Sequence, residues 1–277
     1  MSAALALLTS VLYGVSNFLG PRISQDLPVF AVLIAGQVIA LVVATLLALG
    51  LSDGFLSGVG GAAALAAGVG NAVGLYAFYR AASEGPLSIV APIGALGAVF
   101  PVLAGVIAGE TLGAVRGVGI AVAVAGVALA SRRPGGAPIA PGSHPVAWAA
   151  LAALGFGTFL GFVAPAAASD PLWTVAVSRV SLLAVLLAVA VAGGSPVRVP
   201  VAALPRVALP GLLLFAGTLA YAAATTLGDL SVVSVLASCN PVVTVGLAFV
   251  ISRERLSQSQ SVGVGLALAG VVLVSAR

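Results

Sequence analysis

The chain has 277 residues, of which 61% are hydrophobic and only 6% are charged, and its net charge at pH 7 is +4. Soluble domains carry charge on about a quarter of their residues, so this composition excludes a soluble fold. The basic residues stand singly in short segments, without a basic stripe or interleaved aromatic residues, and this excludes a nucleic-acid partner. Isolated basic residues between apolar segments are instead typical of membrane proteins, where they set the topology.

Long uncharged runs predict membrane-spanning helices. Six runs of 21 to 26 residues contain no charged side chain, and the first of them is Leu27–Ser52. About 20 such residues cross the hydrocarbon core as a helix, whereas strands of a membrane barrel have about 10 residues and alternate in polarity. We therefore expect an all-α polytopic membrane protein with ten transmembrane helices, at 3–20, 28–50, 58–82, 86–108, 111–131, 146–167, 171–193, 206–227, 230–252 and 257–276.

One segment interrupts this series of spans. Residues 132–144, RRPGGAPIAPGSH, are rich in proline and glycine, which oppose regular secondary structure. We expect a linker at 132–145 that separates a first five-helix repeat at 1–131 from a second five-helix repeat at 146–277.

The two halves are also related in sequence. A shift of 144 positions places Glu110 on Glu254, and AGVAL at 125–129 on AGVVL at 269–273. Because each half has an odd number of spans, the two copies cross the membrane in opposite directions. Inverted repeats of this kind are typical of secondary transporters, whose substrate site lies near the midplane between the repeats.

Four stretches resemble a known family: YGVSNF at 13–18 and the segments 78–102, 109–129 and 239–273. They are similar to the EamA-type family of the drug/metabolite transporter superfamily, and in particular to the YddG-like amino-acid exporters. The resemblance implies ten spans around a central cavity, alternating access, and export of amino acids or other small metabolites. The first half departs from the pattern at Gly97, which stands where the second half has a proline.

The candidate substrate-binding residues are polar side chains deep within apolar spans. Such residues normally face a cavity or a polar partner. For the asparagines, the alternative is a hydrogen bond between helices, worth about 1 kcal/mol. A tyrosine close to a loop, such as Tyr79, also fits the aromatic belt at the membrane interface. We expect the cavity to be lined by Tyr13, Asn17, Asn71, Tyr76, Tyr79, Arg179, Tyr221 and Asn240.

Arg179 has three interpretations. It lies nine residues past Asp170, about 13.5 Å along a helix. Its side chain either extends to the interface, or attracts a substrate carboxylate, or bonds to backbone carbonyls or Gln37. Gln37 occupies nearly the same place in the first repeat, which makes the pairing with Arg179 attractive.

Asn240 and Pro241 interrupt the ninth span. Proline is tolerated in membrane helices when neighbouring groups bond the freed carbonyl, and the residue before it resists helical geometry. The sequence therefore predicts a break near Cys239–Asn240, with the Asn240 side chain available to bond the exposed backbone. The break is either a hinge at Pro241, which an alternating-access helix requires, or a purely structural kink.

Several kinds of site are excluded by what the sequence lacks. The single cysteine, Cys239, excludes an internal disulfide and a cysteine-rich metal site. No Asp or Glu lies within an apolar span, and Glu110 and Glu254 are expected to end helices at the interface. No catalytic or metal-binding motif is present, so we expect neither enzymatic activity nor a cofactor nor a metal.

The sequence thus predicts a multi-pass transporter of the inner (plasma) membrane that acts as a monomer on a small-molecule substrate. The expected activity is export of small metabolites, most plausibly amino acids, including aromatic ones, by alternating access. Two alternatives stay open: a multidrug exporter of lipophilic cations, and a pore or structural membrane protein. The lack of buried acids disfavours the first alternative.

Overall fold

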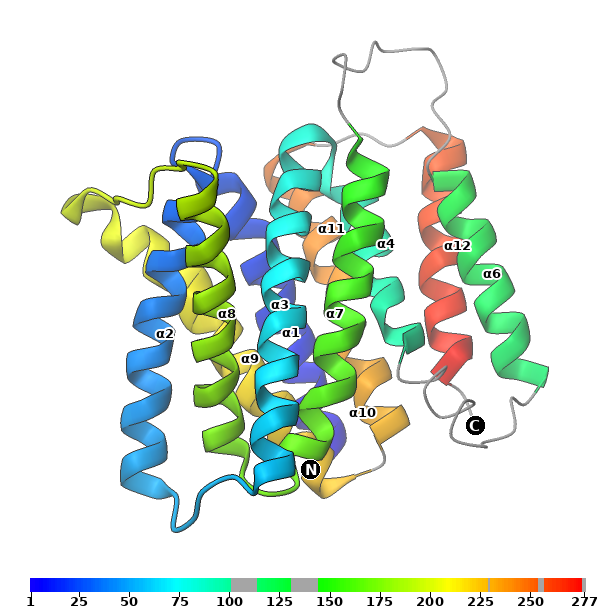
Figure 1. Cartoon of the computed structure of the whole chain (residues 1–277). Helices are drawn as coiled ribbons and strands as arrows, with labels where there is room; N and C mark the ends of the chain where they lie inside the picture. The colour runs from blue at the N-terminus through cyan, green and yellow to red at the C-terminus, as the bar shows by residue number, and fades with distance from the viewer. Residues whose placement is uncertain (101–113, 131–143, 229, 254–256, 276–277) are drawn as a thin grey trace.

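The computed structural model of the chain describes residues 1–100, 114–130, 144–228, 230–253 and 257–275. These residues form helices and connecting turns, with no strand among them (Figure 1). The helices are α1 (Ser2–Ile23), α2 (Val29–Leu51), α3 (Gly58–Glu84), α4 (Leu87–Ala95), η1 (Leu96–Ala98), α6 (Ala114–Ala130), α7 (Pro145–Ala167), α8 (Pro171–Ala192), η2 (Val201–Ala203), α9 (Leu204–Leu227), α10 (Leu230–Ala237), α11 (Asn240–Ile251) and α12 (Gln258–Ser275).

Six of the described helical segments are long and apolar enough to cross a membrane: α1, α2, α3, α7, α8 and α9 together with η2. The prediction of an α-helical polytopic membrane protein is therefore confirmed. The expected ninth span is divided into α10 and α11. The expected linker, apart from its last two residues, lies outside the described residues, and so do Glu110 and Glu254.

Two helices, α3 and α8, begin at residues whose side chains cap them. The Ser57 hydroxyl accepts a hydrogen bond from the Gly60 amide at 3.0 Å and caps α3. Asp170 caps α8 by accepting from the Trp173 amide at 2.8 Å, and its other oxygen accepts from the Ser52 hydroxyl. Pro171 occupies the first helical position. A backbone N–H at that position has no acceptor within the helix, so the lack of an N–H in proline costs no hydrogen bond. Asp170 therefore fixes both the start of α8 and the end of α2.

Replacing Asp170 with alanine should lower the stability of the fold by about 1–2 kcal/mol, because a helix cap is lost together with a bond to a second helix. Asp26 is the matched control, since it is the position that the 144-residue shift places on Asp170. The Asp26 carboxylate pairs with Arg206 at 3.2 Å, but both side chains are more than 60% exposed, so Asp26→Ala should cost less than about 1 kcal/mol. Unfolding in mixed micelles measures both values, and equal losses would contradict the capping role.

The core of the bundle forms where helices of the first half pack along helices of the second. α3 packs along α7, and α1 packs along α9. Glycines let two of the contacting backbones come close, as small residues do in membrane bundles. A Cβ atom at Gly155 of α7 would lie 2.4 Å from the Gly74 nitrogen of α3, and one at Gly211 of α9 would lie 2.2 Å from the Gly36 oxygen of α2.

Side chains tie the same helices together through backbone carbonyls. Ser16 on α1 donates to the Pro210 carbonyl of α9 at 2.8 Å, and Thr9 donates to the Gly217 carbonyl at 3.2 Å. Thr244 on α11 donates to the Gly14 carbonyl of α1 at 3.0 Å. Thr9 and Thr244 also have an acceptor in their own helix, at Leu5 and Asn240, so the interhelical bonds add to the bonding of these buried hydroxyls. The bonds hold α1 between α9 and α11.

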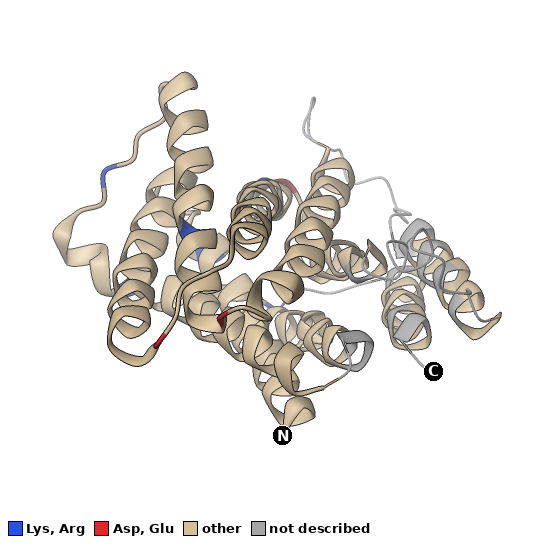
Figure 2. Cartoon of the chain, turned by 60° about the horizontal axis from the view of Figure 1, so that its bottom comes forward, with Lys and Arg blue, Asp and Glu red and all other residues tan. Residues whose placement is uncertain are grey.

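The outer surface of the bundle is apolar. Large hydrophobic side chains are exposed along the outward faces of the helices, for example Leu46 on α2 and Val180 on α8. Acidic and basic residues are few and lie mostly at helix ends and in loops (Figure 2). An exposed apolar surface of this extent is the surface that contacts lipid in a membrane protein. A polar site is therefore expected in the interior of the bundle.

Candidate functional site

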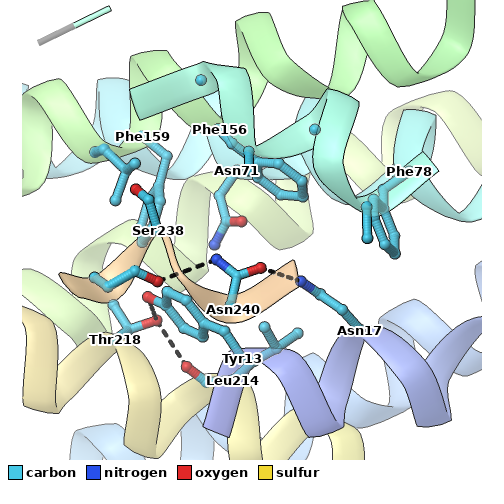
Figure 3. Close-up of a pocket in the computed structure, with 16 residues that line it drawn as sticks. Tyr13, Asn17, Asn71, Phe78, Phe156, Phe159, Leu214, Thr218, Ser238 and Asn240 are labelled. Atoms are coloured by element: carbon cyan, nitrogen blue, oxygen red, sulfur yellow. Dashed lines mark hydrogen bonds between the residues drawn. The ribbon is translucent and has the colours of Figure 1, made fainter. Parts of the chain in front are cut away.

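A pocket lies at mid-height of the bundle, between helices of both halves of the chain (Figure 3). Asn71 lies thirteen residues from each end of α3, and Phe156 lies eleven residues from each end of α7. Tyr13 is likewise central in α1. The lining residues are Tyr13, Asn17, Asn71, Phe78, Ala91, Gly94, Ala95, Gly97, Phe156, Phe159, Leu160, Leu214, Thr218, Ala237, Ser238 and Asn240.

One wall of the pocket is polar. Tyr13 donates to the Thr218 hydroxyl at 3.1 Å, and Thr218 in turn donates to the Leu214 carbonyl at 2.7 Å. The Asn17 amide makes a long hydrogen bond, 3.5 Å, to the side-chain oxygen of Asn240. Asn71 is buried and points toward Asn240 (Figure 3). Amide and hydroxyl groups from α1, α3, α9 and α11 therefore meet in one place.

The other wall consists of aromatic rings and of residues with small side chains. Phe78, Phe156 and Phe159 supply rings, with Phe78 and Phe156 at 6.0 Å between ring centroids. Glycines and alanines of α4 and η1 complete this side. The cavity volume is about 50 Å³, which holds a few water molecules but not an amino acid. The structure therefore has the pocket in a contracted form.

The break between α10 and α11 borders the pocket. α10 ends at Ala237 and α11 begins at Asn240, so the predicted break near Cys239–Asn240 is confirmed. Pro241 has no N–H to donate to the carbonyl four residues earlier. That carbonyl, of Ala237, instead accepts from the Asn240 side-chain nitrogen at 3.1 Å, as the sequence analysis expected. Asn240 thus both caps the break and lines the pocket.

Four of the expected cavity residues, Tyr76, Tyr79, Tyr221 and Arg179, do not line the pocket. Tyr76 stacks on Phe30 of α2 at 5.0 Å between centroids and meets the Trp148 ring edge-on. The Tyr79 hydroxyl packs over Gly20 of α1. These two tyrosines fill contacts between helices rather than the pocket.

Tyr221 is the third expected residue outside the pocket. It is fully buried, and its hydroxyl shares a hydrogen bond of 2.9 Å with Ser234 of α10. It joins α9 to α10 directly beside the helix break.

Arg179 is buried within the bundle rather than extended to the interface, with 1% of its surface exposed. Its guanidinium lies over the Phe215 ring of α9, 5.6 Å from the centroid. None of its three nitrogens has a hydrogen-bond partner among the described residues, and the same is true of the Gln37 side-chain oxygen. The interpretations in which Arg179 extends to the interface, or bonds to backbone carbonyls or Gln37, are therefore wrong for this conformation.

Other lining residues were not among the expected ones. Thr218 and Ser238 are polar residues that the same reasoning could have added. The rings of Phe78, Phe156 and Phe159 carry no signal in the sequence, because phenylalanine in an apolar span fits a lipid face or a core equally well. No cluster of three or more His, Cys, Asp or Glu able to hold a metal ion occurs in the described parts of the chain.

Comparisons with known proteins agree with this architecture. Residues 144–276 match the model of a family described as "EamA-like transporter family". A solved structure described as "Crystal structure of protein" superposes with a TM-score of 0.69 and 15% sequence identity, over 98% of this chain and 95% of that chain. That similarity establishes a shared fold alone. No curated protein matches the sequence significantly.

Proposed function

Through residues 144–276 the chain belongs to the EamA-like transporter family, and we propose that it is a secondary transporter that exports small metabolites, most plausibly amino acids, across the inner membrane. The proposed architecture is ten transmembrane helices in two inverted five-helix repeats, joined by the 132–145 linker. The substrate site is the mid-height pocket, and transport proceeds by alternating access around it.

The packing pairs support the proposed repeat. If α1, α2 and α3 of the first half correspond to α7, α8 and α9 of the second, the contact between α3 and α7 corresponds to that between α9 and α1. The contact between α3 and α8 likewise corresponds to that between α9 and α2. Both members of each pair are present. A two-fold relation of this kind is expected when two inverted copies pack together.

The composition of the pocket carries the proposal of an amino-acid substrate. Amide and hydroxyl groups of Asn17, Asn71 and Asn240 with Tyr13 can bond the polar ends of an amino acid. The phenylalanine rings opposite them offer an apolar surface for its side chain, including an aromatic one. No described lining residue carries a negative charge, which disfavours lipophilic cations as the substrate.

The contracted volume supports a moving carrier rather than a fixed pore. A substrate larger than a few water molecules enters only if helices separate on one side. The break at Ser238–Cys239, with Pro241 beside it, is the proposed hinge for that motion. Its position at the pocket couples the bend of the ninth span to the shape of the site.

Uptake into proteoliposomes tests the proposal. The purified protein should take up radiolabelled L-phenylalanine or L-leucine with a saturable rate, and unlabelled amino acids should compete. Rapid flux that does not saturate would favour a pore. Saturable uptake of lipophilic cations without uptake of any amino acid would favour the multidrug exporter.

Asn71→Leu should reduce saturable transport by about 10- to 100-fold, because a buried amide that bonds a charged substrate group is lost. The substitution preserves the approximate size of the side chain. Tyr76→Phe is the matched control on the same helix, since Tyr76 lies outside the pocket, and it should transport at the rate of the native protein. A similar loss in both variants would assign the effect of Asn71→Leu to helix packing instead.

A further inference from the structure

The buried arginine of α8 is a positive charge without a counter-ion in the described structure. Arg179 lies eight residues into α8 and thirteen from its end, deep in the bundle. Its Nε and both Nη atoms lack hydrogen-bond partners within the part of the chain that the structure describes. An arginine held inside a membrane protein normally pairs with a carboxylate or faces an aqueous cavity. Arg179 does neither in this conformation.

The described acidic residues all lie near helix ends. Three of them bind other groups there. Glu84 pairs with Arg80 at 3.0 Å, Asp26 pairs with Arg206, and Asp170 caps α8. Asp53 lies in the turn after α2. No described carboxylate therefore serves as the counter-ion of Arg179. The guanidinium has five N–H donors, and none of its nitrogens bonds to another described residue.

The guanidinium contacts α9, a helix that also supplies part of the polar wall of the pocket. Leu214 and Thr218 of α9 line the pocket, and Phe215, the neighbour of Leu214, holds Arg179 through its ring. Tyr13 of α1 also lines the pocket, and its hydroxyl donates to Thr218, three residues past Phe215 on the same helix. Arg179 and the polar wall of the pocket thus share α9 as a neighbour.

We propose that Arg179 recognises a carboxylate on the transported solute once the contacts around α9 open. The inference rests on the proposed transport function and names its substrate class: small carboxylic acids and zwitterionic amino acids. A guanidinium binds a carboxylate through two parallel N–H···O bonds. The Gln37 side-chain oxygen, on α2, which packs against α8, also has no partner among the described residues and is an acceptor that suits an ammonium or hydroxyl group.

Arg179 would then determine selectivity by charge. An anionic or zwitterionic solute neutralises the buried cation, whereas a permanently cationic solute is repelled by it. In the contracted form of the pocket the Arg179 guanidinium stays covered. A bound carboxylate supplies the counter-ion that the guanidinium lacks. Substrate binding and the opening of the pocket are therefore linked.

A binding experiment tests the inference without requiring transport. The thermal stability of the purified full-length protein is measured against acetate, benzoate, L-leucine and L-phenylalanine, each compared with its neutral or cationic amide. At least one acid should protect the native protein at a concentration about tenfold lower than its amide does, since bonds to a charged partner are the stronger ones. In Arg179→Gln this preference should disappear.

Two further variants serve as controls. Arg206→Gln removes an arginine from the exposed end of α9 and should keep the preference for acids. Arg179→Lys keeps the charge without the planar fork, so it should bind the same acid more weakly than the native protein but still prefer it to the amide. It serves as the test variant if Arg179→Gln does not fold.

The inference is overturned if no acid protects the native protein better than its amide, or if Arg179→Gln retains the preference. Failure of the proposed function has a different signature. In that case no solute in the panel, whatever its charge, would enter proteoliposomes with a saturable rate, whether or not carboxylates bind at Arg179.

Discussion

The Gly155→Val variant should fail to form the native bundle, because its side chain has no space at the crossing of α3 and α7. A Cβ atom at position 155 would lie 2.4 Å from the Gly74 nitrogen and 2.7 Å from the Gly70 oxygen. These are backbone atoms of α3, so no side-chain rotation can relieve the overlap. We expect a loss of at least about 3 kcal/mol, at the upper end of overpacking effects. The readouts are the amount of monodisperse protein extracted from the membrane and its thermal unfolding.

Gly161→Val is the matched control for this prediction. Gly161 lies on the same helix, and no atom lies within 4 Å of a Cβ built at that position. The added side chain should therefore be accommodated, with a melting temperature close to that of the native protein. Equal yields and melting temperatures for Gly155→Val and Gly161→Val would show that α3 and α7 do not cross at Gly155.

Pro241→Ala should separate stability from transport. An alanine at position 241 restores the N–H group, which can donate to the Ala237 carbonyl and join α10 to α11 in one continuous helix. The fold should become as stable as the native one or more so, because the Ala237 carbonyl gains a backbone donor in addition to the Asn240 side chain. Saturable transport at equal membrane abundance should fall by about tenfold or more, as the barrier to opening rises by more than about 1.4 kcal/mol.

Pro165→Ala is the control for the loss of a proline from a membrane helix. Pro165 lies inside α7 with an exposed side chain, outside the pocket, and its replacement should leave the transport rate unchanged. A native transport rate in Pro241→Ala would rule out the hinge.

The double variant Asn240→Ala/Pro241→Ala distinguishes the two roles of Asn240. In the native background, Asn240→Ala removes both a pocket amide and the partner of the Ala237 carbonyl. With alanine at position 241, that carbonyl has a backbone partner, so the structural cost of losing Asn240 should vanish. Any transport defect that the double variant adds to that of Pro241→Ala then belongs to the pocket.

The positions of the helices could be predicted from the sequence because charged residues are rare in this chain and are unfavourable within a membrane. The uncharged runs place α2, α3, α7 and α8 to within a few residues of their ends in the structure. The break before Pro241 was equally predictable, since the missing N–H and the adjacent asparagine are local features. Backbone chemistry at these sites does not depend on the rest of the fold.

Which face each helix turns toward the pocket was harder to infer. Tyr13, Asn17, Asn71 and Asn240 meet there, whereas Tyr76, Tyr79 and Tyr221 pack between helices. The depth of a polar residue within a span indicates that its side chain either bonds to another group or faces a cavity. It does not indicate which of the two is the case. The rotation of α3 is set by Gly70 and Gly74 against α7, a contact between segments about 80 residues apart that a single sequence does not disclose.

The way α1 pairs with α9 has a consequence for how the chain is made. The ribosome completes α1 long before it reaches Pro210 and Gly217, whose carbonyls are the acceptors for Ser16 and Thr9. The first half of the nascent chain therefore lies in the bilayer before the helices that contact its buried hydroxyls and glycines have been made. Separately expressed halves should be unstable alone and rescued by co-expression, and cellular quality control would act on this protein chiefly between the synthesis of α3 and of α9.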